Sequence, residues 1–132
     1  MGPARVIAAR HLLQFTDDFG NLDIVDLRYL YNRNGRNRIA TSTVGRFDFP
    51  GPAFRSVVDD GRRETSGNDP AEVEREIAPR LAAIEPPLDD VIVECDGEQV
   101  LVYRWRHRVQ PDQFPGFKEL VESVATALRQ AR

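Results

Sequence analysis

The stretch that decides the fold of this chain runs from Val91 to Trp105 and reads VIVECDGEQVLVYRW. Two runs of β-branched and aromatic residues flank Asp96-Gly97, a dipeptide typical of tight turns between antiparallel strands. We therefore predict a β-hairpin with a two-residue turn, in which Cys95 faces Glu98 and the remaining pairs follow from that register.

Both faces of this hairpin are apolar, so we expect both to be covered. One face carries four valines: Val91, Val93, Val100 and Val102. The other face carries a mixed set: Ile92, Glu94, Gln99, Leu101, Tyr103 and Trp105. The valines are expected to lie beneath a C-terminal helix, which leaves the face with the tryptophan in need of a different cover.

The C-terminal helix is predicted from apolar residues that recur every three or four positions. They are Phe117, Leu120, Val121, Val124, Ala125 and Leu128. Asp112 is expected to cap the amino end of this helix, and Pro115 is tolerable in its first turn.

The N-terminal half reads as strands. The segment 5–16 fits a strand or a helix, and the turn-like residues 17–21 favour the strand. Residues 22–31 alternate, and the more apolar set is expected to face the core: Asp23, Val25, Leu27, Tyr29 and Tyr31. Asn34-Gly35 predicts a hairpin turn before a further strand over 38–49.

The middle of the chain contains one predicted helix. Residues 59–69 form either a mobile loop or a short edge strand with a loop. Asp69 is a good N-cap ahead of Pro70, and Pro79 should kink or break the helix that follows. The whole chain, 1–132, is thus predicted to be a single α+β domain. It contains one antiparallel sheet of five to six strands, a kinked middle helix, and an amphipathic C-terminal helix packed on one face.

Composition narrows the functional classes. The chain has 132 residues, a net charge of −3 and a pI of about 5.4, so we expect no general attraction to nucleic acid and no such partner. Its one cysteine, Cys95, permits neither an internal disulfide nor a cysteine-based zinc site. No apolar stretch reaches the ~20 residues that span a bilayer. We expect a cytoplasmic protein without cofactor or metal and without direct membrane insertion.

The usual catalytic motifs are missing from the sequence, so no catalytic residue is assigned. The alternative of an enzyme that acts on a small ligand would rest on His11, Asp26, Arg28 and Tyr29, with no defined reaction. Acidic pairs such as Asp59-Asp60 are explained by turns, in which aspartate bonds nearby amides. We expect a binding module rather than an enzyme.

Two arginine clusters are candidates for anion binding. They comprise Arg33, Arg36 and Arg38 beside the Asn-Gly turn, and Arg104, Arg106 and Arg108 after the late hairpin. Alternating arginines and aromatics along a strand suit weak nucleic-acid binding, but an arginine-rich edge strand that discourages aggregation explains them as well. An anion site becomes credible if the two clusters meet in space.

The strongest functional expectation concerns the second apolar face of the late hairpin. Its candidate interface residues are Ile92, Leu101, Tyr103 and Trp105. Tryptophan and tyrosine are common anchors of protein interfaces, and a contiguous apolar surface rarely stays bare on a monomer. We therefore expect a homo-oligomer, most simply a homodimer, or a complex with a protein partner. The alternative is that the segment 5–16 covers this face.

Part of the chain resembles a known group of proteins. Residues 24–31, 35–38, 41–49, 78–81 and 91–104 look like the soluble domain of uncharacterised bacterial proteins that are frequent in GC-rich actinobacteria. Those proteins often carry membrane helices ahead of this domain, which this chain lacks, and the group implies no activity and no site residues. If residues 5–16 were helical, the element order would also resemble the small acidic chaperones of bacterial secretion systems.

Overall fold

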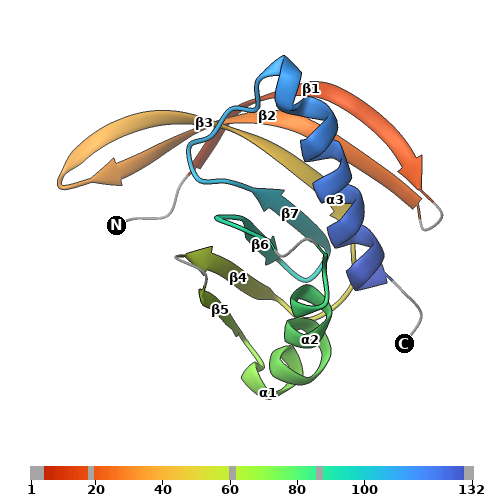
Figure 1. Cartoon of the computed structure of the whole chain (residues 1–132). Coiled ribbons are helices and arrows are strands. Elements are labelled where there is room, and N and C mark those ends of the chain that lie inside the picture. The colour runs from red at the N-terminus through yellow and green to blue at the C-terminus, as the bar shows by residue number, and fades with distance from the viewer. Residues whose placement is uncertain (1–4, 18–19, 60–61, 86–87, 130–132) are drawn as a thin grey trace.

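The computed structural model describes residues 5–17, 20–59, 62–85 and 88–129. Within these residues one open antiparallel sheet has seven strands in the order β1-β2-β3-β7-β6-β4-β5 (Figure 1). The strands are β1 (Arg5–Asp17), β2 (Gly20–Arg33), β3 (Arg36–Asp48), β4 (Phe54–Asp59), β5 (Arg62–Gly67), β6 (Ile92–Cys95) and β7 (Gln99–Tyr103). The α+β class with an antiparallel sheet is confirmed.

The strand count of five to six is wrong, because Phe54–Asp59 (β4) forms a strand that was not predicted, and residues 62–67 form the edge strand that was one of the two interpretations of 59–69. β5 pairs with β4 along its whole length, from Asp59↔Arg62 to Phe54↔Gly67. Residues 62–67 thus form a strand although none of them is a hydrophobic residue. The segment 5–16 is a strand, as preferred, and it forms the other edge of the sheet. Residues 60–61 of the expected loop lie outside the described residues.

The late hairpin sits in the middle of the sheet. β7 pairs with β3 and β6 pairs with β4, so the hairpin is inserted between two strands that are consecutive in the chain. Each of the strands β6 and β7 is therefore hydrogen-bonded to a neighbouring strand along both of its edges.

The predicted two-residue turn of this hairpin is wrong. Cys95 pairs with Val100, not with Glu98, so the connection is two residues longer. The Asp96 carboxylate accepts hydrogen bonds from the amides of Glu98 (2.8 Å) and Gln99 (2.9 Å), which stabilises the longer loop. Because a strand has a period of two, this shift leaves every side chain on its predicted face.

The helical segment in the middle of the chain begins where the sequence predicts it. The Asp69 side chain accepts the Glu72 amide at the start of α1 (Pro70–Glu72), as expected of an N-cap. A π-helical turn (Val73–Ile77) then leads into α2 (Ala78–Ala82), which places the irregularity next to Pro79.

The C-terminal helix α3 (Phe114–Arg129) follows a 3₁₀ turn (Pro111–Gln113). Its cap is not Asp112: Gln110 and Gln113 bond each other's backbone in a capping box. The 3₁₀ turn moves the capping position upstream of Pro111, and Asp112 falls inside the turn.

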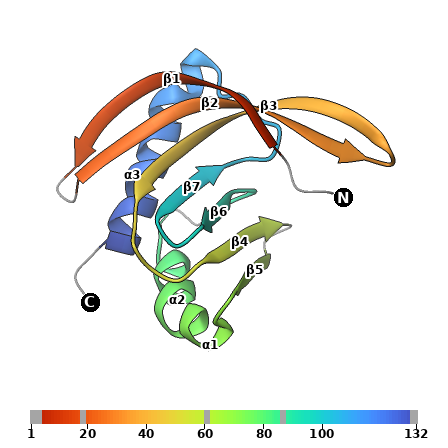
Figure 2. The same ribbon diagram turned by 180° about the vertical axis from the view of Figure 1, so that it is seen from behind.

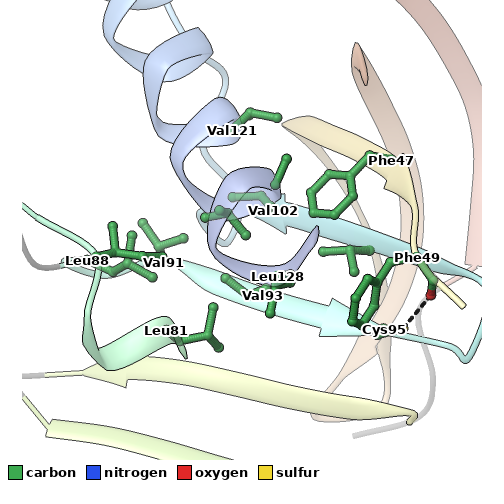
Figure 3. Close-up of a cluster of buried hydrophobic side chains, with 14 of the residues drawn as sticks. Phe47, Phe49, Leu81, Leu88, Val91, Val93, Cys95, Val102, Val121 and Leu128 are labelled. Carbon is green, nitrogen blue, oxygen red and sulfur yellow. Dashed lines mark hydrogen bonds between the residues drawn. The ribbon is translucent and has the colours of Figure 1, made fainter. Parts of the chain in front are cut away.

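The main core lies between the sheet and the helices (Figure 3). All four predicted valines belong to it and are at most 1% exposed. Val121, Val124 and Leu128 of α3 pack against them, as the helix stripe predicts. Cys95 is buried in the same layer, where burial raises the pKa of its thiol.

Strand β2 departs from its predicted polarity. Leu22 and Ile24, of the set expected to be less apolar, enter the main core. Val25, of the other set, joins a second cluster on the opposite face of the sheet, and Tyr29 is buried as well. Both faces of β2 are buried along its central part, because the main core covers one face and the second cluster covers the other. Among the described residues, no helix is long and apolar enough to cross a membrane.

Candidate functional site

The face of the sheet that turns away from α2 and α3 is called the open face here. Figure 2 shows the strands from this side, with the helices behind them. It carries a second apolar cluster in which Val25, Val44, Ile92 and Tyr103 are buried. Leu27, Val57 and Leu101 are partly buried beside it. The late hairpin therefore has two apolar faces, as predicted, and the helices cover only one.

The β2–β3 hairpin extends beyond the rest of the sheet, away from α3 (Figures 1 and 2). The described part of β1 ends its pairing at Arg5↔Leu30, and β7 ends its pairing with β3 at Val44↔Tyr103. Past Leu30 the described residues form two strands, paired from Tyr31↔Arg38 to Arg33↔Arg36. This two-stranded ribbon, residues 31–38, is called the arm.

Trp105 lies where the arm joins the sheet. β7 ends at Tyr103, and a turn follows in which the His107 amide bonds the Arg104 carbonyl (3.2 Å) and Arg106 has a positive φ of 57°. The turn places the indole of Trp105 against the rings of Tyr29 (centroids 5.3 Å apart) and Tyr31 (5.6 Å). Tyr29 and Tyr31 are buried, whereas Trp105 remains 39% exposed.

The large hydrophobic side chains that stay exposed lie near this place, on both faces of the sheet. Among the described residues they are Val6 (57% exposed), Ile7 (44%), Ile39 (54%) and Trp105 (39%). Val6 pairs with Tyr29 and Trp105 packs on Tyr29, so both lie on the open face, and Ile7 follows Val6 at the bulge of the β1 edge. Ile39 pairs with Leu30 and therefore lies on the helical side. We call Val6, Ile7 and Trp105 the arm-base patch. Scattered apolar exposure is ordinary, but a gathered patch marks an interaction surface.

A small cavity of about 150 Å³ opens on the patch, between Val6 of β1, Trp105 and Leu101. Its polar groups are engaged with one another. The Tyr29 hydroxyl bonds the Ser42 hydroxyl (3.0 Å), and the Tyr103 hydroxyl donates to Glu94 (2.9 Å). Burial and the nearby Glu94 carboxylate raise the pKa of Tyr103, so its phenol stays protonated. The cavity therefore offers an apolar surface, and the hydroxyl groups that line it already have hydrogen-bond partners. Neither phenol is activated as a nucleophile.

The four predicted interface residues are unequally accessible. Ile92 (6% exposed) and Tyr103 (9%) are buried, and Leu101 is partly buried. Trp105 alone of the four presents a large exposed surface. β1 does not lie across this face; it extends the sheet at its edge and contributes Val6 to the cavity. The sequence pattern missed Val6, Ile7 and Ile39, whose exposure depends on where the neighbouring strands end.

The arginines after the hairpin do not form a stripe, because the strand stops before them. Arg104 lines a cavity of about 670 Å³ on the helical side, together with His107. Arg108 pairs with the buried Asp26 (Nε–Oδ2 3.2 Å). Arg106 lies 5.8 Å from the centroid of the Tyr31 ring. β7 is also a central strand, so the interpretation of this segment as an edge strand is wrong.

One member of each arginine cluster nevertheless meets at Tyr31. Arg38 is the cross-strand partner of Tyr31, and Arg106 lies over its ring. The other arginines of the first cluster, Arg33 and Arg36, pair with each other further along the arm.

The residues of the enzyme hypothesis do not converge. Asp26 accepts from the Thr43 hydroxyl (2.7 Å) and pairs with Arg108, in contact with the segment that leads to α3. Tyr29 faces the opposite side, in the open-face cavity. His11 is exposed, with Nε2 3.5 Å from the Arg46 guanidinium, which itself pairs with Asp23. Asp26 and Thr43 together fasten the segment 107–109 to the sheet, since Asp26 pairs with Arg108 and the Thr43 hydroxyl accepts a hydrogen bond from the Val109 amide (2.8 Å).

The fold and the open face define a small α+β protein with one antiparallel sheet, helices on one side and an apolar surface on the other. The chain matches no protein-family model, no curated protein and no solved structure.

Proposed function

We propose that this protein is a non-enzymatic interaction module that associates with a second copy of itself through the arm-base patch. The observation that carries the proposal is the exposure of Val6, Ile7 and Trp105 beside Tyr29, at the junction of the open face and the β1 edge. A tryptophan ringed by aliphatic side chains is the composition of a binding hot spot.

The free edge of β1 favours a second copy as the partner. Among the described residues β1 pairs only with β2, so its outer backbone groups are available to another strand. Thirteen residues of strand span roughly 40 Å. Two copies of such an edge can pair antiparallel about a two-fold axis, which is the commonest symmetry of homo-oligomers.

A two-fold axis near Ala8 and Ala9 would pair residues 5–12 of the two copies and would place Val6 and Ile7 of each copy against the β1 edge of the other. The apolar face of the late hairpin would then continue across both molecules. Kinship with the actinobacterial domains and a cytoplasmic location remain part of the proposal, but the interaction surface depends on neither.

Sedimentation equilibrium over a range of concentrations tests the proposal. The unmodified chain should show a mass that rises from one to two copies. Ile7→Lys should keep the chain monomeric, because a lysine on an edge strand blocks pairing with another edge. Trp105→Ser should weaken the dimer at least tenfold, since an aromatic hot spot contributes about 2 kcal/mol or more.

Leu120→Ser is the matched control, because Leu120 is a partly buried leucine of α3 on the helical side. It should leave the dimerisation constant unchanged, and circular dichroism should show that all variants are folded. A chain that stays monomeric at millimolar concentration contradicts the proposal. So does a dimer that Ile7→Lys and Trp105→Ser leave intact.

A further inference from the structure

The charges of this chain are segregated. Residues 27–47 contain five arginines and not one acidic residue or lysine, although the whole chain has a net charge of −3. The expectation of no nucleic-acid partner rests on that overall balance. At physiological ionic strength charges interact over only about 8 Å, so the arm acts on a ligand through its local charge.

The arm concentrates its arginines on one side. Arg33 and Arg36 are direct cross-strand partners, and Arg38 is the partner of Tyr31. Cross-strand partners share a face, and residues two apart on a strand share it too, so all three arginines lie on the side of Tyr31. Like charges directly opposite each other destabilise a strand pair. These three arginines are exposed, and none of them forms an ion pair with another described residue that would offset the repulsion.

Arg106 extends this cationic face toward the sheet. Its guanidinium lies over the Tyr31 ring, next to the position of Arg38. It reaches that place from a left-handed backbone conformation, which costs a non-glycine residue on the order of 1 kcal/mol. Four arginines thus follow one side of a projecting ribbon and its base.

We propose that the arm is a binding element for B-form duplex DNA, with the side of Arg33, Arg36 and Arg38 placed in the major groove. The major groove, about 12 Å wide and 8.5 Å deep, admits a two-stranded β-ribbon. The three residues per strand beyond the last β1 pair project roughly 10 Å, which matches the depth of the groove. Arginine bonds phosphates and guanine edges in a fixed fork geometry.

The arm fits a duplex better than a single strand. Single-strand binders stack successive bases on open aromatic rings. The rings here are covered: Tyr31 is 3% exposed and Tyr29 7%, and only Trp105 presents a partly free surface. The narrow major groove of A-form RNA excludes such a ribbon as well.

Fluorescence anisotropy with a labelled 20-base-pair DNA duplex, at several salt concentrations, tests the proposal. Three to four phosphate contacts predict that the logarithm of the binding constant falls with the logarithm of salt with a slope of about −3 to −4. The triple variant Arg33→Gln, Arg36→Gln, Arg38→Gln should have a shallower slope of roughly −1. Its affinity at low salt should be at least tenfold weaker.

The triple variant Arg55→Gln, Arg75→Gln, Lys118→Gln is the matched control. It removes the same charge from exposed positions outside the arm, each in a surface ion pair. It should bind DNA as the unmodified chain does. Circular dichroism should show both variants folded, since exposed pairs contribute little to stability.

Three outcomes would overturn the proposal: no salt-dependent binding by the unmodified chain, equal loss in both triple variants, or unchanged binding by the arm variant. Tighter binding of single-stranded DNA or duplex RNA would also overturn it, because it would assign the surface to another ligand. Competition by poly-glutamate as strong as that by duplex DNA would show an unspecific polyanion surface or an acidic protein partner instead. The dimer variant Ile7→Lys should still bind the duplex, which separates this proposal from self-association.

Discussion

The indole of Trp105 and the phenol of Tyr29 lie with ring centroids 5.3 Å apart, at an interplanar angle of 42°. Together with Tyr31 they form an aromatic cluster that joins the arm to the body of the sheet. The cluster fixes the position of the proposed contact surface, because Trp105 follows the last residue of β7 by only two positions.

Trp105→Ala should lower the free energy of unfolding of the monomer by about 1–3 kcal/mol, since it removes two aromatic pairs worth about 0.5–1.5 kcal/mol each. Trp105→Phe keeps an aromatic ring and should lose less than half as much. Urea denaturation of both variants, followed by circular dichroism in the monomeric Ile7→Lys background, measures the difference. A Trp105→Ala variant as stable as the Ile7→Lys background would show that the indole makes no stabilising contact with the tyrosines.

Gly45 on β3 lies directly beneath Val121 of α3. A methyl group at position 45 would overlap the Val121 side chain, with Cγ1 only 2.8 Å away. Gly45→Ala should therefore destabilise the fold by about 1–3 kcal/mol, and Val121→Ala should be less harmful in that background than alone. Gly116→Ala is the control: no atom lies within 4 Å of its Cβ position in α3, so this change should stabilise the protein slightly. Thermal unfolding of the unmodified chain, the two single variants, their double variant and Gly116→Ala gives the comparison, and additive losses at Gly45 and Val121 would refute the close contact.

Thr43 links the sheet to the segment that precedes α3. Thr43→Val leaves both the Asp26 carboxylate and the Val109 amide without this buried partner. The expected loss is about 2–4 kcal/mol of unfolding free energy. Arg108→Gln removes only the exposed partner of Asp26 and should cost at most about 1 kcal/mol. Chemical denaturation ranks the two variants, and a larger effect of Arg108→Gln would contradict this assignment.

The Tyr103 phenol should make stability depend on pH in the alkaline range. Burial and Glu94 raise its pKa in the folded protein above the value of about 10 in the unfolded chain. The folded state therefore favours the protonated phenol. Its contribution is fully present below pH 10 and is lost as the pH rises toward the folded pKa. Tyr103→Phe should show a shallower decline in unfolding free energy from pH 10 to 12 than the unmodified chain. Parallel declines in the two proteins would exclude Tyr103 as the source.

Local pattern was enough to predict several elements. The stripe of α3, the Asp69 cap and the two faces of the late hairpin depend on periodicity and capping chemistry within short segments. The hairpin register failed because Asp96-Gly97 suggests the shortest turn, while the Asp96 carboxylate stabilises a longer one. The prediction of which residues share a face remained correct, since every pair is displaced by two residues.

The candidate site depended on long-range pairing, which local pattern does not contain. Nothing in the sequence of β3 indicates that β7 is its neighbour and ends at Val44↔Tyr103. That ending frees the arm, exposes Ile39 and turns Trp105 onto the tyrosines. The sequence predicted the tryptophan as an anchor but placed it on a continuing strand, and it offered no reason to group Val6 and Ile7 with it.

Hydrogen–deuterium exchange of the β1 amides at low and high protein concentration tests the proposed self-association most directly. The amides of residues 6–11 that point away from β2 should exchange rapidly in the dilute chain and become protected at high concentration, while the amides of α3 stay unchanged. Exchange of residues 6–11 that does not depend on concentration, or new protection on α3 instead, would contradict the proposal that the β1 edge and the arm-base patch form the contact surface.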